Sequence, residues 1–193
     1  MPEVHHMPTP ARSPHAQPLV TGQSSMAIIN LRGNAQDVAF VQAVHTALGV
    51  TLPIEPCSTV SNLQVRIVWA GPDDWFVIAQ AGLETALVQQ LQQALHGHHC
   101  AVTDVSSGYF LVTLEGPQAR DLLSQGCPMD FHPREFKLDR AVGTHFFKVG
   151  LYLWQRDAIP TFEMLVRRSF IDHFWQLIQL CTQSYGWVGK QTA

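Results

Sequence analysis

The chain has 193 residues, of which 46% are hydrophobic, and its 12 basic and 15 acidic residues give a formal net charge of −3. This length suits one domain, or one domain with a tail, and the composition is ordinary for a protein with a buried core. The charge forms no basic stripe and no acidic block, which argues against binding to nucleic acid or to an anionic membrane.

The sequence shows no sign of a membrane span or of export. No apolar run reaches the roughly 18 residues that a membrane-spanning helix needs. The first residues, MPEVHHMPTPARSPHAQP, lack the apolar core of a secretory signal. The cysteines are scattered, without a C-x-x-C pair, at Cys57, Cys100, Cys127 and Cys181. We therefore expect a cytoplasmic protein with reduced thiols.

Residues 1–25 differ in composition from the rest of the chain. They are rich in Pro, Ser, Thr and His and nearly free of large apolar side chains. Such a segment buries too little surface to offset the entropy lost on ordering, so we predict a disordered tail. Residues 26–193 are predicted to form a single α+β domain.

In chain order, the apolar periodicity and the turn residues predict a strand at 26–33, a helix at 35–48, strands at 63–71 and 75–80, a helix at 83–97, strands at 100–106 and 109–116, a helix at 117–126, one or two strands at 142–155, a strand at 161–168 and a helix at 169–185. Strand pairs, rather than single strands, separate the helices. This order predicts an α+β fold with a mainly antiparallel sheet and packed helices.

Individual residues set the expected ends and faces of these helices. Asn34 is the predicted N-cap of the first helix, and Gly49 is its predicted end. The second helix has a leucine at every fourth position, which predicts one buried face. The expected apolar face of the last helix consists of Phe170, Phe174, Leu177 and Cys181.

The segment from His96 to Cys100 reads HGHHC, and its side chains are of types that bind zinc. A structural zinc site needs four converging ligands, and a catalytic one needs three. Gly97 interrupts the helix, and the adjacent His98 and His99 would point to opposite faces of a strand. We therefore interpret the segment as a polar loop between a helix and a strand, and we expect no metal site on this chain.

Asp104, Ser106 and Ser107 lie between two predicted strands and could suggest a nucleophile. No G-x-S-x-G elbow surrounds them, and an acid does not activate a serine without an intervening base. Hydroxyls in such a turn commonly bond to backbone groups, and we favour this structural interpretation.

Cys127 and Asp130 follow the predicted helix at 117–126. The negative end of a helix disfavours a thiolate, so we expect Cys127 to be an inert thiol. Asp130 is a candidate base without an identified partner. Arg167 and Arg168 end the last predicted strand and could hold a carboxylate, although a local salt bridge with Asp172 or another surface acid explains the pair equally well.

Nucleotide-binding motifs are missing from the sequence: no G-x-G-x-x-G follows a predicted strand, and there is no Walker loop. From its residues alone, the chain is an α+β domain without a convincing catalytic set.

Four segments together resemble one family, the gamma subunit of heterotetrameric sarcosine oxidase. They are INLRGNAQDVAFVQAVHTALGVTLP at 29–53, WAGPDDWFVIA at 69–79, HHCAVTDVSSGYFLVTLEGPQARDLLSQGCPMDFHP at 98–133 and FEMLVRRSF at 162–170. Their order and spacing match the family over nearly all of residues 26–186.

That family is in turn similar to the folate-binding domain of aminomethyltransferases such as the glycine-cleavage T-protein. The shared features are the DVS strand at 104–106, a strand that ends in Gly116-Pro117, and a helix containing Ala119, Leu122 and Leu123. The transferases carry an Asn-Asp pair where this chain has Met129-Asp130, so Asp130 alone matches. The Lys-Gly-Cys-Tyr motif of the relatives that maintain iron–sulfur clusters has no counterpart.

The resemblance implies a non-catalytic gamma subunit in a complex with alpha, beta and delta subunits, mainly in contact with alpha. Such a complex oxidatively demethylates sarcosine to glycine, produces hydrogen peroxide and delivers the one-carbon unit to tetrahydrofolate. It would carry FAD, FMN, NAD and the folate site on or between alpha and beta, and zinc on delta, with no cofactor on this chain.

Two other functions stay open from the sequence. One is a free-standing folate-binding enzyme or sensor, whose candidate site residues are Asp104, Asp130 and Arg167. The other is a structural homologue recruited to an unrelated complex.

Overall fold

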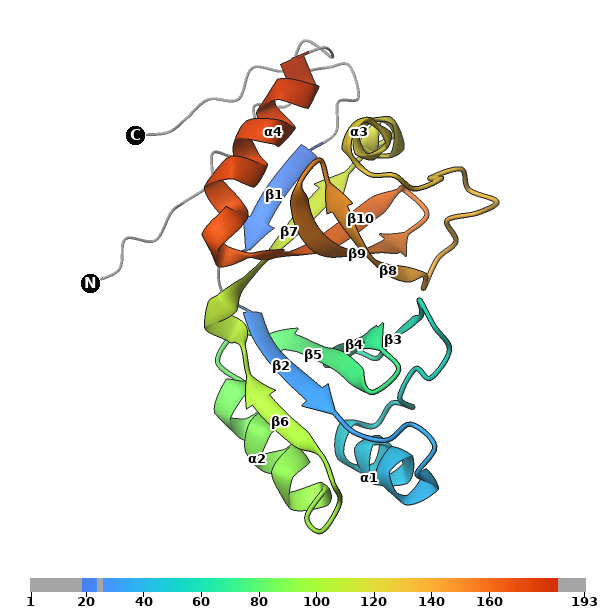
Figure 1. Ribbon diagram of the computed structural model, residues 1–193, viewed down its shortest axis with the longest axis vertical. Coiled ribbons are helices and arrows are strands. Elements are labelled where there is room, and N and C mark those ends of the chain that lie inside the picture. Colours follow the sequence, from blue (N-terminus) through green and yellow to red (C-terminus); the bar gives the residue numbers. More distant parts are fainter. Residues whose placement is uncertain (1–18, 24–25, 184–193) are drawn as a thin grey trace, which may run out of the picture. The chain divides into compact units, whose positions relative to one another are not determined.

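The structure is a computed structural model that describes residues 19–23 and 26–183 (Figure 1). These residues form ten β-strands, four α-helices and two 3-10 helices, arranged in two compact units. Of the described residues, unit 2 contains 26–109 and 139–142, and unit 1 contains the others. Each unit is built on a five-stranded sheet. The predicted α+β class with antiparallel sheets is therefore confirmed, whereas the expected single domain over 26–193 stays a prediction.

Unit 2 contains the elements β2 (Met26–Arg32), α1 (Val38–Leu48), β3 (Thr59–Ser61), β4 (Val65–Gly71), β5 (Asp74–Gln80), α2 (Glu84–Ala94), β6 (Ala101–Asp104) and the 3-10 helix η1 (Ser106–Gly108). The strand order is β3-β4-β5-β2-β6, and every neighbouring pair is antiparallel. The predicted hairpin between the strands on either side of Pro72 is confirmed as β4 and β5.

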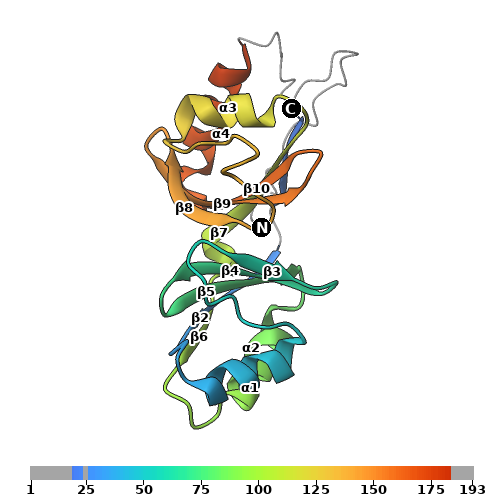
Figure 2. The same cartoon turned by 90° about the vertical axis from the view of Figure 1, so that its right-hand side faces the viewer.

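Helices α1 and α2 cover one face of this sheet, as Figure 2 shows. Alternate residues of each strand point to that face because side chains in a strand alternate between faces. Ile29, Ile67 and Val77 are fully buried there, together with Val44 and Leu91 from the helices. The sequence predicts both features: alternating apolar residues in the strands and one apolar face on each helix.

Unit 1 contains β1 (Leu19–Gln23), most of β7 (Tyr109–Glu115), α3 (Ala119–Gly126), the larger part of β8 (Ala141–Phe146), β9 (Val149–Asp157), β10 (Thr161–Arg167), the 3-10 helix η2 (Arg168–Phe170) and α4 (Ile171–Gln183). The strand order is β1-β7-β10-β9-β8. The region 142–155, expected to hold one or two strands, holds two.

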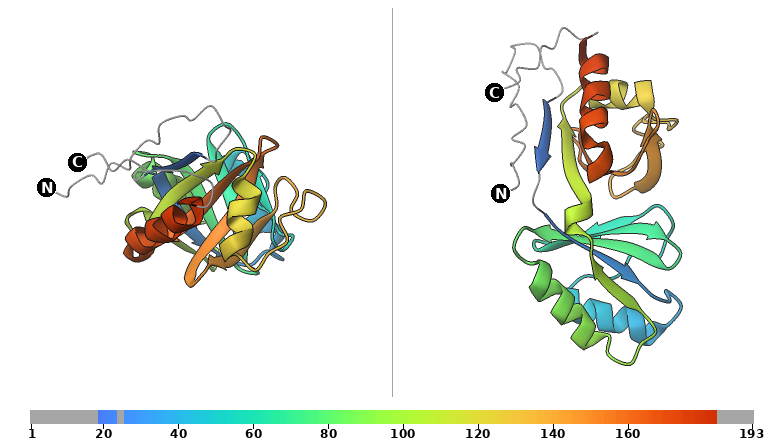
Figure 3. Two further views of the ribbon diagram at one scale, coloured as in Figure 1. Left: turned by 90° about the horizontal axis from the view of Figure 1, so that it is seen from above. Right: turned by 60° about the vertical axis from the view of Figure 1, so that its left-hand side comes forward.

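Helices α3 and α4 lie on the same face of the unit 1 sheet (Figure 3). Phe146 on β8 contacts both of them: its ring centroid is 5.6 Å from that of Phe174 on α4, and its ring lies against Gly126 at the end of α3. A Cβ atom at position 126 would come within 2.6 Å of that ring. A glycine at the end of α3 therefore allows the helix to approach β8 closely.

The structure corrects several local predictions. Asp37, not Asn34, is the N-cap of α1, and its carboxylate accepts hydrogen bonds from the backbone N–H groups of Ala39 and Phe40. Leu63 precedes β4 and is fully exposed, so the strand starts at Val65. The Gly49 end of α1 is confirmed, with φ of +67°.

The last helix differs from its prediction at its first turn. Ser169 and Phe170 form the 3-10 helix η2, and α4 begins only at Ile171. Phe170 is 45% exposed, whereas Ile178 joins Phe174 and Cys181 in the core. The predicted end of the helix at Tyr185 lies outside the described residues.

The boundary of the predicted tail also needs correction. Residues 19–23 form β1, which pairs with β7 in an antiparallel register from Leu19 opposite Glu115 to Gln23 opposite Leu111. The short segment LVTGQ gave no strand signal because it lacks clear apolar alternation. Pairing with β7, and not the composition of the segment itself, holds residues 19–23 in a strand conformation. The rest of the predicted tail lies outside the described residues.

Candidate functional site

Asp104 and Ser106 form a local hydrogen-bonded turn at the end of β6. The backbone N–H of Ser106 donates to Asp104 Oδ1 at 2.9 Å, and the Ser106 hydroxyl donates to the same oxygen at 2.5 Å. The backbone N–H of Ile28 on the adjacent β2 donates to Ser106 Oγ at 2.9 Å. The predicted bond between this hydroxyl and the backbone is therefore confirmed, and it fixes β2 to the turn that follows β6.

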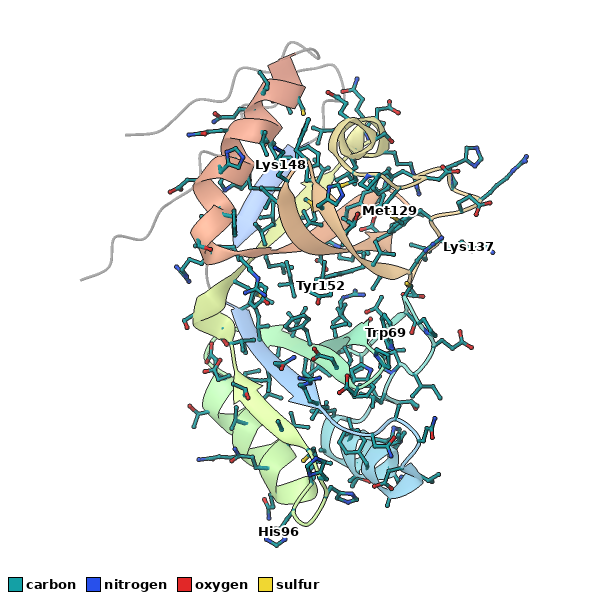
Figure 4. All side chains as sticks on the ribbon, in the orientation of Figure 1. Trp69, His96, Met129, Lys137, Lys148 and Tyr152 are labelled. Carbon is teal, nitrogen blue, oxygen red and sulfur yellow. The ribbon has the colours of Figure 1, made fainter. Side chains whose placement is uncertain are left out.

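The HGHHC segment forms the connection between α2 and β6, as the sequence predicts. His96 lies at the end of unit 2 where α2 stops (Figure 4). His98 Nδ1 lies 3.4 Å from Asp37 Oδ2, and its ring meets that of Phe40 edge-on with centroids 6.3 Å apart. The loop is thus attached to the N-terminus of α1. Within residues 19–23 and 26–183, no group of three or more His, Cys, Asp or Glu side chains is arranged to hold a metal ion.

Hydrogen bonds to Asp37 bring the start of α1 and the α2–β6 loop together. The pKa of Asp37 is lowered, first by the hydrogen bond from the Phe40 backbone N–H and also by His98, against an opposing effect of desolvation. An N-cap carboxylate satisfies backbone donors that have no partner within the helix, so the charged form is favoured. We interpret this pair of contacts as structural.

The loop after α3 carries Asp130 and is held from two sides. Phe131 is buried, and its ring packs against those of Phe136 and Phe162 with centroids 5.3 and 5.8 Å away. Asp130 itself is exposed, and its Oδ1 accepts a 2.8 Å hydrogen bond from the backbone N–H of His132. Figure 4 labels the neighbouring Met129 in this loop. The Asp130 carboxylate thus accepts this hydrogen bond from the turn to which it belongs.

Arg120 on α3 is the residue that fixes this loop to the sheet, and the sequence analysis missed it. Its Nη1 donates to the Phe131 carbonyl, and its Nη2 donates to Gln155 Oε1 on β9 at 2.9 Å. The guanidinium also lies 5.3 Å from the ring centroid of Phe162. Desolvation lowers the pKa of Arg120, yet a guanidinium remains charged at neutral pH. One arginine within a short helix gives no sequence signal for such a role.

Cys127 follows α3 and is 6% exposed. Burial raises the pKa of its thiol to about 12, so the reactive thiolate is scarce at neutral pH. The prediction of an unactivated thiol is confirmed, although desolvation rather than the helix end is the cause. All four cysteines lie in the described part of the chain, and none is joined in a disulfide.

A second polar cluster in unit 1 also escaped the sequence analysis. Glu163 on β10 is 8% exposed, and its Oε2 accepts a 2.7 Å hydrogen bond from the indole N–H of the fully buried Trp154. Its Oε1 lies 3.2 Å from Nη1 of Arg156. A buried carboxylate needs such partners to offset the loss of hydration. Glu163 and Trp154 are directly opposite each other in the β9–β10 register, so the cluster stabilises this strand pair.

Arg167 and Arg168 are exposed at the junction of β10 and η2. The Arg168 guanidinium lies over the ring of Phe110 on β7, 4.3 Å from its centroid. Of the three folate-site candidates, Asp130 and Arg167 belong to unit 1 and Asp104 belongs to unit 2. Their role as site residues stays a prediction.

Residues 32–184 match the model of the sarcosine oxidase, gamma subunit family. The chain belongs to this family. It is 34% identical over 132 residues to the sarcosine oxidase subunit gamma of Corynebacterium sp. (strain U-96), and the matched segment covers 68% of this chain and 63% of that relative. The subunit gamma of Arthrobacter sp. is 33% identical over the same length, covering 68% and 64%. The match thus spans somewhat less than two thirds of each relative.

Solved structures agree with this family membership. A chain of the heterotetrameric sarcosine oxidase from Corynebacterium sp. U-96, solved in complex with pyrrole 2-carboxylate, superposes with a TM-score of 0.81 and 27% identity, covering 91% of this chain and 88% of that one. The glycine cleavage system aminomethyltransferase T from Bartonella henselae superposes with a TM-score of 0.63 at 17% identity, covering 83% of this chain and 45% of that one. The second match shows that the fold is shared with aminomethyltransferases. No helix within the described residues is long and apolar enough to cross a bilayer.

Proposed function

We propose that this chain is a non-catalytic gamma subunit that assembles with alpha, beta and delta subunits into a cytoplasmic, heterotetrameric sarcosine oxidase. The observation that carries the proposal is the 0.81 TM-score to a chain of such a complex, over 91% of this chain. The proposed complex demethylates sarcosine to glycine, forms hydrogen peroxide and passes the one-carbon unit to tetrahydrofolate. FAD, FMN, NAD, zinc and the folate site belong to the other subunits, and the main contact of this chain is with alpha.

The geometry of the candidate carboxylates supports an assembly role over catalysis. Asp104 and Asp130 each accept a hydrogen bond from a backbone N–H two residues further along the chain. This is the arrangement of a turn that an Asp side chain stabilises. Neither nucleophile candidate is placed to react. Ser106 is hydrogen-bonded to the backbone of β2, and Cys127 is buried and has a raised pKa.

The test is co-expression of this chain, carrying an affinity tag, with the alpha, beta and delta chains of a heterotetrameric sarcosine oxidase from the same genome. Purification through the tag should yield a complex with a flavin absorbance spectrum and sarcosine-dependent formation of hydrogen peroxide. A tagged chain that never captures a flavoprotein would contradict the proposal.

The Asp130→Asn variant then separates assembly from catalysis. Asparagine keeps the oxygen that accepts from the His132 backbone N–H, so the loop and the assembly should be preserved. If this chain is non-catalytic, the variant complex retains its activity with sarcosine and tetrahydrofolate. A large loss of kcat in a correctly assembled variant would assign Asp130 a catalytic role. Calorimetric titration of the isolated chain with tetrahydrofolate tests the free-standing folate-binding alternative.

A further inference from the structure

From the sheet topology of unit 1, we infer that the outer edge of β7 is a docking site for an extended strand. The chain covers this edge with its own strand β1, and the uncovered edge accepts the equivalent strand of a second copy of this chain. This inference goes beyond the proposed function, because it concerns the self-association of the chain before it meets any other subunit.

The first observation is the position of β7. The strand lies between β1 and β10, so without β1 it would form the edge of the sheet (Figures 1 and 3). The β1–β7 register is continuous over five residues, with Thr21 opposite Thr113 at its centre. All of the backbone groups that β7 turns away from β10 would then be available for pairing with another chain.

The second observation is that β7 lacks the features that usually protect an edge strand. It reads YFLVTLE over seven residues, with no proline and no lysine, and its register against β1 is continuous. Its central residues Leu111, Val112, Thr113 and Leu114 are all buried. Natural edges are kept short, charged, bulged or covered, because long apolar edges pair with other strands.

The other strands at the sheet edges differ from β7 in this respect. In unit 2, β3 has three residues and β6 has four, and three of the four β6 residues are exposed. In unit 1, β8 carries the exposed residues Gly143 and His145 near its centre. Cover by β1 is therefore needed at β7 more than at any of these three strands.

The third observation concerns β1 itself. It is a five-residue strand that contains Gly22, and a glycine within a strand weakens its pairing. Only two residues separate Gln23 from the start of β2, although β1 and β2 belong to different sheets. Short connections of this kind favour exchange of an identical element between copies. The family match begins at Arg32, so β1 lies outside the segment by which the family is recognised.

The test compares full-length variants that open or lock the edge. Val20→Pro/Thr21→Pro places a proline at two successive positions of β1, so at least one removes an N–H that faces β7. The matched control, Val20→Ile/Thr21→Val, preserves both N–H groups. Because its own β1 carries the prolines, the proline variant offers an open edge but cannot supply the strand. Light scattering during size-exclusion chromatography should show a monomer for this variant alone and a larger complex when it is mixed with the unmodified chain, whereas the control variant should gain no mass in the same mixture.

A synthetic peptide of residues 18–24 provides the second measurement. A fluorescent form of this peptide should bind the proline variant and compete with the unmodified chain for its open edge. Its half-saturation on the unmodified chain should be at least about tenfold higher, because tethered β1 competes at an effective concentration of about millimolar. A peptide carrying Thr21→Pro should bind neither protein.

A cross-link keeps the inference testable if the proline variant fails to fold. Thr21→Cys/Thr113→Cys joins the two residues that are opposite each other in the register, and the oxidised protein should exclude the peptide. If the peptide exchanges into the unmodified chain and the cross-link blocks this exchange, the docking site is supported. A folded proline variant that binds neither the unmodified chain nor the peptide overturns the inference. A cross-linked variant that takes up the peptide as readily as the unmodified chain does overturns it as well.

Discussion

Replacing Arg120 by methionine should release the loop that carries Asp130. Methionine keeps most of the aliphatic side chain but removes the donors to Gln155 Oε1 and to the Phe131 carbonyl. The buried Gln155 side chain cannot rotate to give its oxygen a new donor without breaking a second hydrogen bond, because its amide nitrogen donates to the Asp157 carbonyl at 2.7 Å. Leaving a buried acceptor without a donor costs about 1–3 kcal/mol.

Loss of the contact with the Phe162 ring adds about 0.5–1 kcal/mol. We therefore expect Arg120→Met to lower the free energy of unfolding by about 1.5–4 kcal/mol, as measured by urea denaturation. Hydrogen exchange should increase over residues 127–136, where Phe131 and Phe136 lose their anchor.

Arg32→Met is the matched control for this change. Arg32 also contacts an oxygen at 2.8 Å, on Asp73, but the two side chains are 53% and 60% exposed. Exposed pairs of this kind contribute at most about 1 kcal/mol. The proposed role of Arg120 is refuted if both variants lose the same stability, or if exchange over 127–136 stays unchanged in Arg120→Met.

Three further predictions test other parts of the structure. Gly33→Ala places a Cβ 2.4 Å from the ring of the buried Phe40 and should cost more than about 1 kcal/mol in a thermal melt, whereas Gly108→Ala, with open space around it, should have less effect. The pKa of Asp37 is lower in the folded chain than in the unfolded one. The ionised carboxylate therefore stabilises the fold fully above the unfolded pKa, and this stabilisation is lost as the pH falls through the folded pKa. The difference in Tm between the native chain and Asp37→Ala should thus shrink below about pH 4. Cys127, with a pKa of about 12, should resist iodoacetamide at pH 8 until urea unfolds the chain, and rapid labelling of the native protein would contradict its burial.

The sequence predicted the parts of the fold that local physical chemistry determines. The helices α1 and α2 and the β4–β5 hairpin follow from apolar periodicity, Gly49 and Pro72, all of which act within a few residues. Strand β1 could not be predicted in this way, because its order depends on pairing with β7, which is some ninety residues further along the chain.

The N-cap of α1 shows where local reasoning is ambiguous. Asn34 and Asp37 both have side chains that cap helices, and Asn34 does accept a hydrogen bond, from the backbone N–H of Gln36. The contact of Asp37 with His98, 61 residues away, adds a tertiary preference that no local pattern contains. Arg120 and Glu163 escaped prediction for the same reason, since their partners lie on other elements.

The candidate site residues show why the type of a residue alone did not identify a function. Asp104 and Asp130 each lie at the start of a turn, and each carboxylate accepts from a backbone N–H two residues on. An aspartate in such a turn is selected by the geometry of the backbone whether or not a ligand binds nearby. The resemblance to folate-binding domains is therefore expected to survive at these positions even in a chain that performs no chemistry. For this reason the Asp130→Asn variant is informative. It keeps the turn and removes the charge, so a loss of activity would report a catalytic role of the carboxylate and not a structural one.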